Sequence, residues 1–314
     1  MVSGLVVCCG ASLQAMSLDE ELLMLAAQQD VPVDLLRRLA RHPGARRQVA
    51  LRRDLPLELI EEIISLGSAR TLAANSSLPA SVRARLAEHP EAAVRAALAA
   101  SAPDNPVGLL ARLAQDPDPL VRAFLAMNEH LDPAIAAGLA ADTESSVRAA
   151  IVQNWRGAPE QVRRSLLTDT DPAIRKAAAR AYVLPRDLMP QLLADPTTRA
   201  AVTQYTEPTM ELATDPDEEV RRALAEHPAL PANIRDLLAQ DPNIFVRNAI
   251  AARPDIPRAL RDTLVAGLKP DNPQAEFLLA LTRAHHACPP PAPAPEPRTY
   301  TYAQAEELLA RAGL

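Results

Sequence analysis

A short motif recurs along most of this chain and restricts its fold to a stack of repeats. The motif reads L-A-x-[DH]-P, then V-R-x-A-[LIV]-A, then [LI]-P. Clear copies span residues 86–99, 113–126, 212–225 and 238–251. The prolines that open successive copies lie 23 to 27 residues apart, so the period is about 25. Similarity at a fixed period is the signature of stacked repeats, and we expect one elongated α-solenoid of about ten repeats.

The copy that opens at Pro231 shows how one repeat is expected to fold. Two short helical elements carry apolar stripes, at Ile234, Leu237 and Leu238 in the first and at Val246, Ala249 and Ile250 in the second. Neither stripe can be buried within one repeat, so neighbouring repeats supply the burial. We therefore expect Leu237→Ala to cost about 2–5 kcal/mol, whereas Arg47→Ala is expected to change stability little.

Composition agrees with an all-α fold. Aromatic residues make up only 3% of the chain, and Leu and Ala, which favour helices, dominate over β-branched runs. A period of about 25 leaves little room for two full-length helices. One element of each repeat is therefore expected to be a short α-helix or a 3₁₀-helix.

The ordered Leu-Leu, Asp-Pro, Val-Arg and closing Pro positions resemble those of the leucine-rich repeat variant family over about residues 30–270. The chain resembles HEAT and armadillo arrays more loosely. The family resemblance implies a right-handed superhelix in which an α-helix alternates with a 3₁₀-helix. Three segments depart from the pattern, at 66–70, 142–147 and 195–199, and irregular stacking is expected there.

The predicted organisation has four parts: a flexible segment at 1–16, the solenoid at 17–282, a proline-rich linker at 283–299 and a short amphipathic helix at 300–314. Ser17 and Glu20 form a capping box that marks the start of folded structure. Met16 is therefore an alternative start of the chain. The linker includes PPPAPAPEP at 289–297, which favours an extended spacer.

One arginine recurs in the Val-Arg position, and stacking is expected to align these side chains into an arginine ladder. Its members are Arg46, Arg95, Arg122, Arg148, Arg175, Arg199, Arg221 and Arg247. In one interpretation each arginine pairs with the aspartate of an Asp-Pro turn, such as Asp116, Asp215 or Asp241. In the other, free guanidinium groups bind phosphate or acidic peptide, with support from the basic cluster at 46–53.

Other candidates are single residues. Trp155 is the only tryptophan, and it is either a partner contact or a filler between repeats. A base-flipping site like that of the HEAT-repeat DNA glycosylases needs more aromatic residues than this chain brings together. His285, His286 and Cys288 match no closed zinc pattern, His42 and His89 replace the aspartate of the turn, and Cys8 and Cys9 are too few for an iron–sulfur cluster.

The C-terminal helix carries an apolar face with Tyr302, Leu308 and Leu309. So short a helix is marginal alone. We therefore expect it to dock, either onto the solenoid of its own chain or onto another protein.

The function predicted from these features is a non-enzymatic cytoplasmic scaffold that binds a protein or peptide, without cofactor or metal. A net charge of −6 disfavours general attraction to nucleic acid or anionic membranes, and no apolar stretch is long enough to span a bilayer. The alternatives are a nucleic-acid-binding solenoid that uses the arginine ladder and a repeat enzyme of the DNA glycosylase or cofactor lyase type.

Overall fold

The computed structural model describes residues 17–101, 107–128, 131–267 and 299–314. Their regular structure is helical throughout, which confirms the all-α prediction. The described chain forms two compact units: residues up to Asp132 together with the C-terminal helix, and residues from Pro133 onward. The predicted segment 1–16, residues 268–282 of the predicted solenoid and nearly all of the predicted linker lie outside the described residues.

The first unit contains short helices that alternate between the two elements of the repeat. They are α1 (Leu18–Ala27), α2 (Val33–Arg41), α3 (Pro43–Ala50), α4 (Leu57–Ser65), α5 (Ala69–Ala73), α6 (Ala80–Leu86), α7 (Ala92–Ala100), α8 (Val107–Leu113), α9 (Pro119–Ala126) and the C-terminal α22 (Tyr302–Arg311).

The second unit continues the same alternation. Its helices are α10 (Pro133–Leu139), α11 (Ser145–Asn154), α12 (Glu160–Leu167), α13 (Pro172–Ala181), the 3₁₀-helix η1 (Arg186–Leu188), α14 (Met189–Ala194), α15 (Pro196–Thr203), α16 (Met210–Ala213), α17 (Glu218–Ala225), α18 (Ala232–Leu238), α19 (Ile244–Ala252) and α20 (Arg258–Gly267). Both elements of most repeats are thus short α-helices, and among the described residues the 3₁₀ form is confined to η1.

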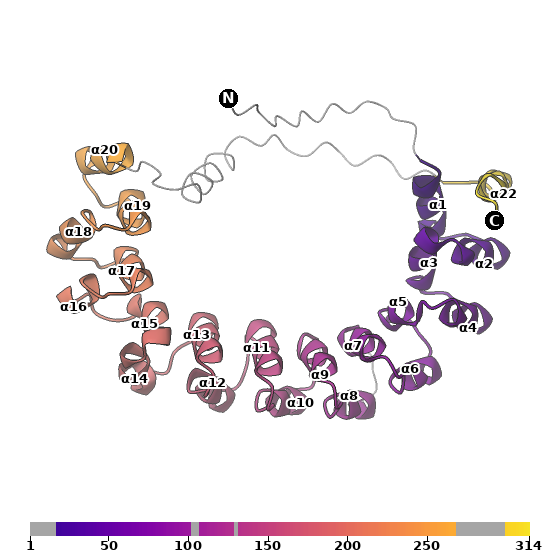
Figure 1. The fold of residues 1–314 in the computed structure, drawn as a ribbon, viewed down its shortest axis with the longest axis horizontal. Helices are drawn as coiled ribbons and strands as arrows, with labels where there is room; N and C mark the ends of the chain where they lie inside the picture. Colours follow the sequence, from indigo (N-terminus) through magenta and orange to yellow (C-terminus); the bar gives the residue numbers. More distant parts are fainter. Residues whose placement is uncertain (1–16, 102–106, 129–130, 268–298) are drawn as a thin grey trace. The chain divides into compact units, whose positions relative to one another are not determined.

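Within each unit the helices form two rows (Figure 1). The second helices of successive repeats pack directly on one another, as α7 does on α9 and α13 does on α15. Each first helix packs on the second helix of its own repeat, as α2 does on α3 and α18 does on α19. This sequential packing is the solenoid that the repeated motif predicted.

Prolines and aspartates set where the helices begin. The proline that opens most repeats is the N-cap residue rather than part of the first turn, with ψ between 144° and 152° at Pro32, Pro56, Pro79, Pro159 and Pro231. Several second helices start with a proline preceded by an aspartate, and the side chain of that aspartate caps the helix, as Asp171 does before Pro172. The chain therefore leaves and re-enters helical geometry at fixed points.

The core lies between the two rows, and one predicted core residue is wrong. Ile234, Leu238, Val246 and Ile250 are buried as expected, and Ala249 packs against the same cluster, but Leu237 is 39% exposed. The seven-residue α18 uses only one side, on which positions i and i+4 align, so the residue before Leu238 falls on the flank. Aligned copies carry an arginine there, in Arg-Leu-Ala at 85–87 and 112–114.

The repeat of α4 and α5 has neither an aspartate or histidine nor a proline in its turn, and it ends its first helix differently. Gly67 follows α4 with φ of +76°, a left-handed conformation that glycine adopts without steric cost. The Gly67 N–H donates to the Ile64 carbonyl at 2.9 Å, and the Ser68 N–H donates to the Ile63 carbonyl at 3.2 Å. Glycine thus supplies the break that proline and aspartate supply in other repeats.

Candidate functional site

Most of the ladder arginines bind the aspartate of the next repeat. Nitrogen to carboxylate oxygen distances are 2.7 Å in five pairs: Arg95–Asp116, Arg148–Asp169, Arg175–Asp195, Arg199–Asp215 and Arg221–Asp241. Each pair joins consecutive second helices at their N-terminal ends. The arginines therefore hold neighbouring repeats together.

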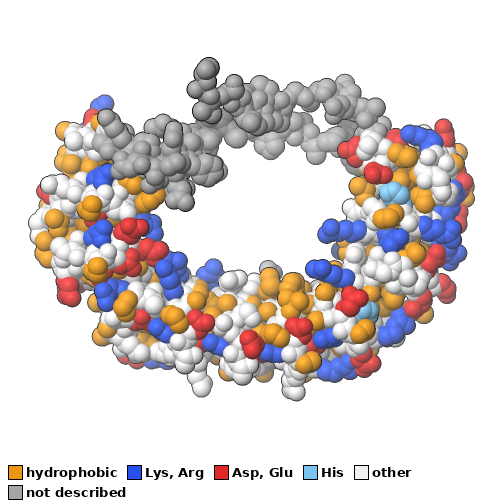
Figure 2. All heavy atoms as spheres, viewed as in Figure 1, with side chains coloured by type: hydrophobic (Ala, Val, Ile, Leu, Met, Phe, Trp, Pro, Cys, Tyr) orange, Lys and Arg blue, Asp and Glu red, His pale blue; other side chains and the backbone are white. Residues whose placement is uncertain are grey.

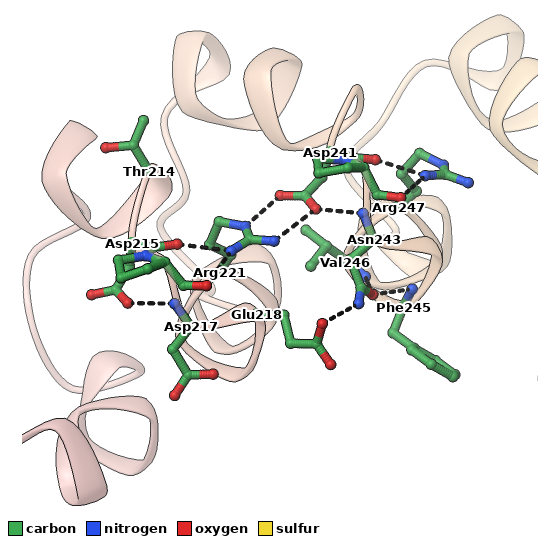
Figure 3. A network of polar contacts seen from close by, with 12 residues as sticks. Thr214, Asp215, Asp217, Glu218, Arg221, Asp241, Asn243, Phe245, Val246 and Arg247 are labelled. Atoms are coloured by element: carbon green, nitrogen blue, oxygen red, sulfur yellow. Dashed lines mark hydrogen bonds and ion pairs between the residues drawn. The ribbon is translucent and has the colours of Figure 1, made fainter.

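The Arg221 pair shows the full set of contacts (Figure 3). Arg221 Nε and Nη2 donate to Asp241 Oδ2 and Oδ1 at 2.7 and 3.2 Å, and Nη1 donates to the Asp215 and Pro216 carbonyls at 2.8 and 3.2 Å. Asp241 Oδ1 also accepts the Asn243 N–H at 2.8 Å. One guanidinium group therefore closes the turn of its own repeat and binds the turn of the next.

Burial and pairing compete at these carboxylates. For Asp116, Asp169 and Asp195, burial favours the neutral acid, but hydrogen bonds from the paired arginine and from the backbone N–H two residues later outweigh it. The pKa of each of the three carboxyl groups lies below its ordinary value. The charged form is therefore the one that the folded repeats stabilise.

The remaining ladder arginines donate to backbone carbonyls. Arg46 Nη1 donates to Leu66 O at 2.8 Å, Arg122 Nη1 to Asp116 O at 2.7 Å and Arg247 Nη1 to Asp241 O at 2.7 Å. Leu66 lies in the turn without an aspartate, so there the carbonyl of Leu66 takes the place of the acid. All eight predicted ladder residues contribute guanidinium donors to the protein's own acceptors.

In two turns a histidine takes the place of the aspartate and accepts the same kind of backbone hydrogen bond. His42 and His89 occupy the aspartate position, and their Nδ1 atoms accept the Ala45 and Glu91 N–H groups at 3.3 and 3.2 Å. In the preceding second helices the arginine position holds Leu22 and Ala69. Histidine replaces aspartate where the preceding repeat lacks the arginine, a signal that an alignment of the repeats would have revealed.

A second group of polar side chains links the C-terminal ends of the second helices. Asn75 Nδ2 donates to Ala50 O at 2.9 Å, Ser101 Oγ to Ala73 O at 2.8 Å and Asn128 Nδ2 to Ala99 O at 3.3 Å. Arg253 Nη1 does the same in the second unit, with Ala225 O at 2.8 Å. Because the last carbonyls of a helix lack partners within it, these donors satisfy them from the next repeat. Sequence analysis missed this set, because its residue types vary between repeats.

This second set is interrupted after α13 and α15, where tyrosines stand instead. Tyr182 follows α13, is 5% exposed, and its hydroxyl has no hydrogen-bond partner. Burial raises its pKa to about 12, against the smaller opposing effects of Arg156 and Arg163. Tyr205, just beyond α15, is 63% exposed, and Val183 is 78% exposed.

A pocket of about 440 Å³ opens at this interruption. We call it the Tyr182–Tyr205 pocket, and its lining is Arg180, Ala181, Tyr182, Val183, Leu184, Arg186, Met189 and Tyr205. Arg180 and Arg186 bring positive charge to its lining, and Arg180 shares the carboxylate of Glu219 with Lys176, at 3.1 and 2.8 Å. The pocket thus combines exposed apolar and aromatic surface with a cationic rim.

The other predicted site residues lie elsewhere. Trp155 is half-buried at the C-terminal end of α11 and does not line this pocket. His285, His286 and Cys288 lie outside the described residues. Within the described ranges no group of three or more His, Cys, Asp or Glu side chains is placed to hold a metal ion, and no described helix is long and apolar enough to cross a membrane.

The predicted docking helix packs on its own chain. In α22, Leu308 and Leu309 are 3% and 0% exposed, and the helix contacts α1 and α2. Tyr302, expected on the apolar face, is instead 54% exposed, and its hydroxyl donates to Asp34 Oδ2 at 2.9 Å. Docking within the chain is therefore the arrangement that the structure shows.

One of three comparisons with known proteins finds a likeness. No model of a protein family matches this chain, and a search of curated proteins finds no match. Among solved structures, one described as "a leucine-rich repeat variant with a novel repetitive protein structural motif" is 21% identical, with a TM-score of 0.45 over 68% of this chain and 84% of that chain. The sequence resemblance pointed to the same kind of protein, while the solenoid assignment rests on this chain's own helices.

Proposed function

We propose that the protein is a non-enzymatic cytoplasmic scaffold that binds an extended segment of another protein at the Tyr182–Tyr205 pocket. The observation that supports this proposal most strongly is the exposure of Val183 and Tyr205 around a pocket of about 440 Å³. Tyrosine and arginine are enriched among residues that dominate binding energy. Pockets of about 300–1,000 Å³ hold small ligands, and this one has room for one or two large side chains.

Charge favours an acidic partner segment. Two cationic side chains, Arg180 and Arg186, line the pocket, and Arg180 shares the carboxylate of Glu219 with Lys176. An apolar side chain of the partner would enter between Val183 and Tyr205, and a neighbouring Asp or Glu would meet the rim. Complementary charge of this kind sets orientation and speeds association.

The nucleic-acid alternative draws no support from the arginine ladder. The guanidinium groups of the ladder pair with aspartates and carbonyls of the solenoid itself. On the face shown in Figure 2, Lys and Arg alternate with Asp and Glu in both units and form no continuous basic stripe. Backbone phosphates are bound by aligned unpaired cations, and the ladder does not present them.

Selection from a random peptide display library tests the proposal. The wild-type protein is expected to enrich peptides with an aromatic or aliphatic residue next to Asp or Glu. Tyr205→Ala should weaken their binding about tenfold or more, while Leu57→Ala, which trims an apolar side chain 51% exposed in the other unit, should leave it unchanged. Failure of the wild type to enrich any peptide, or equal binding by Tyr205→Ala, would refute the pocket.

A further inference from the structure

The C-terminal helix completes the first repeat of the solenoid. Helix α1 stands in the row of second helices, and α22 contacts α1 and α2 (Figure 1). The same relation holds inside the second unit, where the first helix α16 contacts α17 of its own repeat and α18 of the next. Helix α22 therefore takes the place of the first helix that α1 otherwise lacks.

The polar contacts of α22 also match those between ordinary repeats. Arg38 Nη1 donates to Glu306 Oε1 at 2.6 Å, just as Arg85 and Arg112 in the first-helix row pair with Glu61 and Glu88 of the preceding repeats at 2.7 and 3.1 Å. Arg38 thus forms with α22 the same kind of arginine–glutamate pair that the corresponding arginines form with the preceding repeat.

Further hydrogen bonds fix where α22 begins and ends. The Gln28 side chain donates to Tyr300 O at 3.0 Å and accepts the Tyr300 N–H at 2.7 Å, and Arg38 Nη2 donates to Leu314 O at 2.8 Å. The bonds to Tyr300 and Leu314 are made to the backbone and fix the register of the helix, whereas Arg38 also pairs with the Glu306 side chain. They contain nothing that distinguishes the helix of the same chain from that of another copy.

Open space remains beside the docked helix. A cleft of about 520 Å³ lies beside it, lined among others by Glu21, Tyr300, Gln304 and Leu308. Ordinary repeat helices are joined to their neighbours by short turns, whereas residues 268–298 separate α20 from the segment that leads into α22. Non-covalent contacts therefore determine which face α22 occupies.

We propose that the α1–α2 face also accepts α22 of a second copy of this chain once its own helix has left, so that the helix of one copy completes the first repeat of another. Exchange of an identical element between copies preserves every contact that the element makes within one copy. The partner is thus a second copy, whose Tyr300 and Glu306 are bound by Gln28 and Arg38. Its Leu308 and Leu309 are buried in the same docking arrangement.

Reciprocal charge reversal tests this proposal with the full chain. Arg38→Glu alone and Glu306→Arg alone each set like charges against one another within a copy, whereas a mixture of the two variants restores opposite charges between copies. In the mixture we expect a 1:1 complex of twice the single-chain mass in sedimentation velocity. Hydrogen exchange should show residues 302–311 unprotected in each variant and protected in the mixture.

The double variant, with both reversals in one chain, is the matched control and should remain at the mass of one chain with α22 protected. If Glu306→Arg leaves α22 protected, Leu309→Asp replaces it, because Leu309 is fully buried. If Arg38→Glu leaves α22 protected, Gln28→Ala is added to it, because Gln28 makes two hydrogen bonds to Tyr300. The intact α22 of the Arg38→Glu copy should then dock on the intact face of the Leu309→Asp copy. Mixtures that stay at the mass of one chain across the accessible concentrations, with α22 unprotected, would overturn the proposal.

Discussion

Removal of one ladder arginine should loosen the contact between two repeats, and Arg221→Ala is the clearest case. The side chains of Arg221 and Asp241 are 14% and 4% exposed, and the substitution leaves the carboxylate without its cationic partner and removes the arginine donor from two carbonyls. Loss of one partner from a buried ion pair costs about 3–5 kcal/mol. Because Asp241 keeps its hydrogen bond from Asn243 and Arg221 retains some access to water, we expect about 2–3 kcal/mol here.

The neighbouring Arg222 provides the matched control. It pairs with Glu226 one turn later at 3.0 Å, with side chains 45% and 54% exposed, so Arg222→Ala should cost only about 0.3–0.5 kcal/mol. Urea unfolding followed by circular dichroism measures both, and hydrogen exchange should locate the loss in α17 and α19. Adding Asp241→Asn completes a double-mutant cycle with an expected coupling of about 1–3 kcal/mol. Equal destabilisation by Arg221→Ala and Arg222→Ala would refute the pairing as the link between repeats.

Three further outcomes follow from burial and pKa. Leu238→Ala should cost about 2–5 kcal/mol, but Leu237→Ala less than about 1 kcal/mol, in parallel urea titrations. Because the pKa of Asp116 is lowered in the folded state, its contribution to stability is complete above about pH 4 and is lost as pH falls through the folded pKa. Melting temperatures should therefore be flat from about pH 7 to 5 and fall below about pH 4, less steeply in Asp116→Asn. Because burial raises the pKa of Tyr182 to about 12, the free energy of unfolding should decline between about pH 10 and 12. Tyr182→Phe should remove that decline. It should not lower the melting temperature at pH 7, since the hydroxyl has no hydrogen-bond partner.

Most of the fold could be predicted from the repeated motif, because each position of the motif has a local physical role. Proline and aspartate begin helices, and the apolar stripes require neighbours, so the solenoid follows from the period and the pattern. The arginine to aspartate pairing was one of two interpretations, and sequence alone left both open because pairing depends on which turn stacks on which helix. The burial of Leu237 was mispredicted because periodicity places a residue on a helix face but does not give the width of the buried strip.

The Tyr182–Tyr205 pocket could not be read from the sequence. It arises where the polar side chains that link C-terminal helix ends are replaced by tyrosines, and those links use Asn, Ser or Arg without a shared motif. The docking position of α22 could not be predicted from the sequence either, because its partners Gln28 and Arg38 lie more than 260 residues away along the chain. Contacts between segments so distant in sequence follow from the three-dimensional stack and not from local pattern.

The affinity of a selected acidic peptide for two variants tests the central claim most directly. The arginine ladder joins neighbouring repeats, and we propose that the Tyr182–Tyr205 pocket binds the partner. Isothermal titration should show about tenfold or greater loss of affinity in Tyr205→Ala and little change in Arg247→Ala, whose guanidinium binds the Asp241 and Pro242 carbonyls. Unchanged binding by Tyr205→Ala together with loss in a folded Arg247→Ala would contradict the account and return the ladder to the position of binding site.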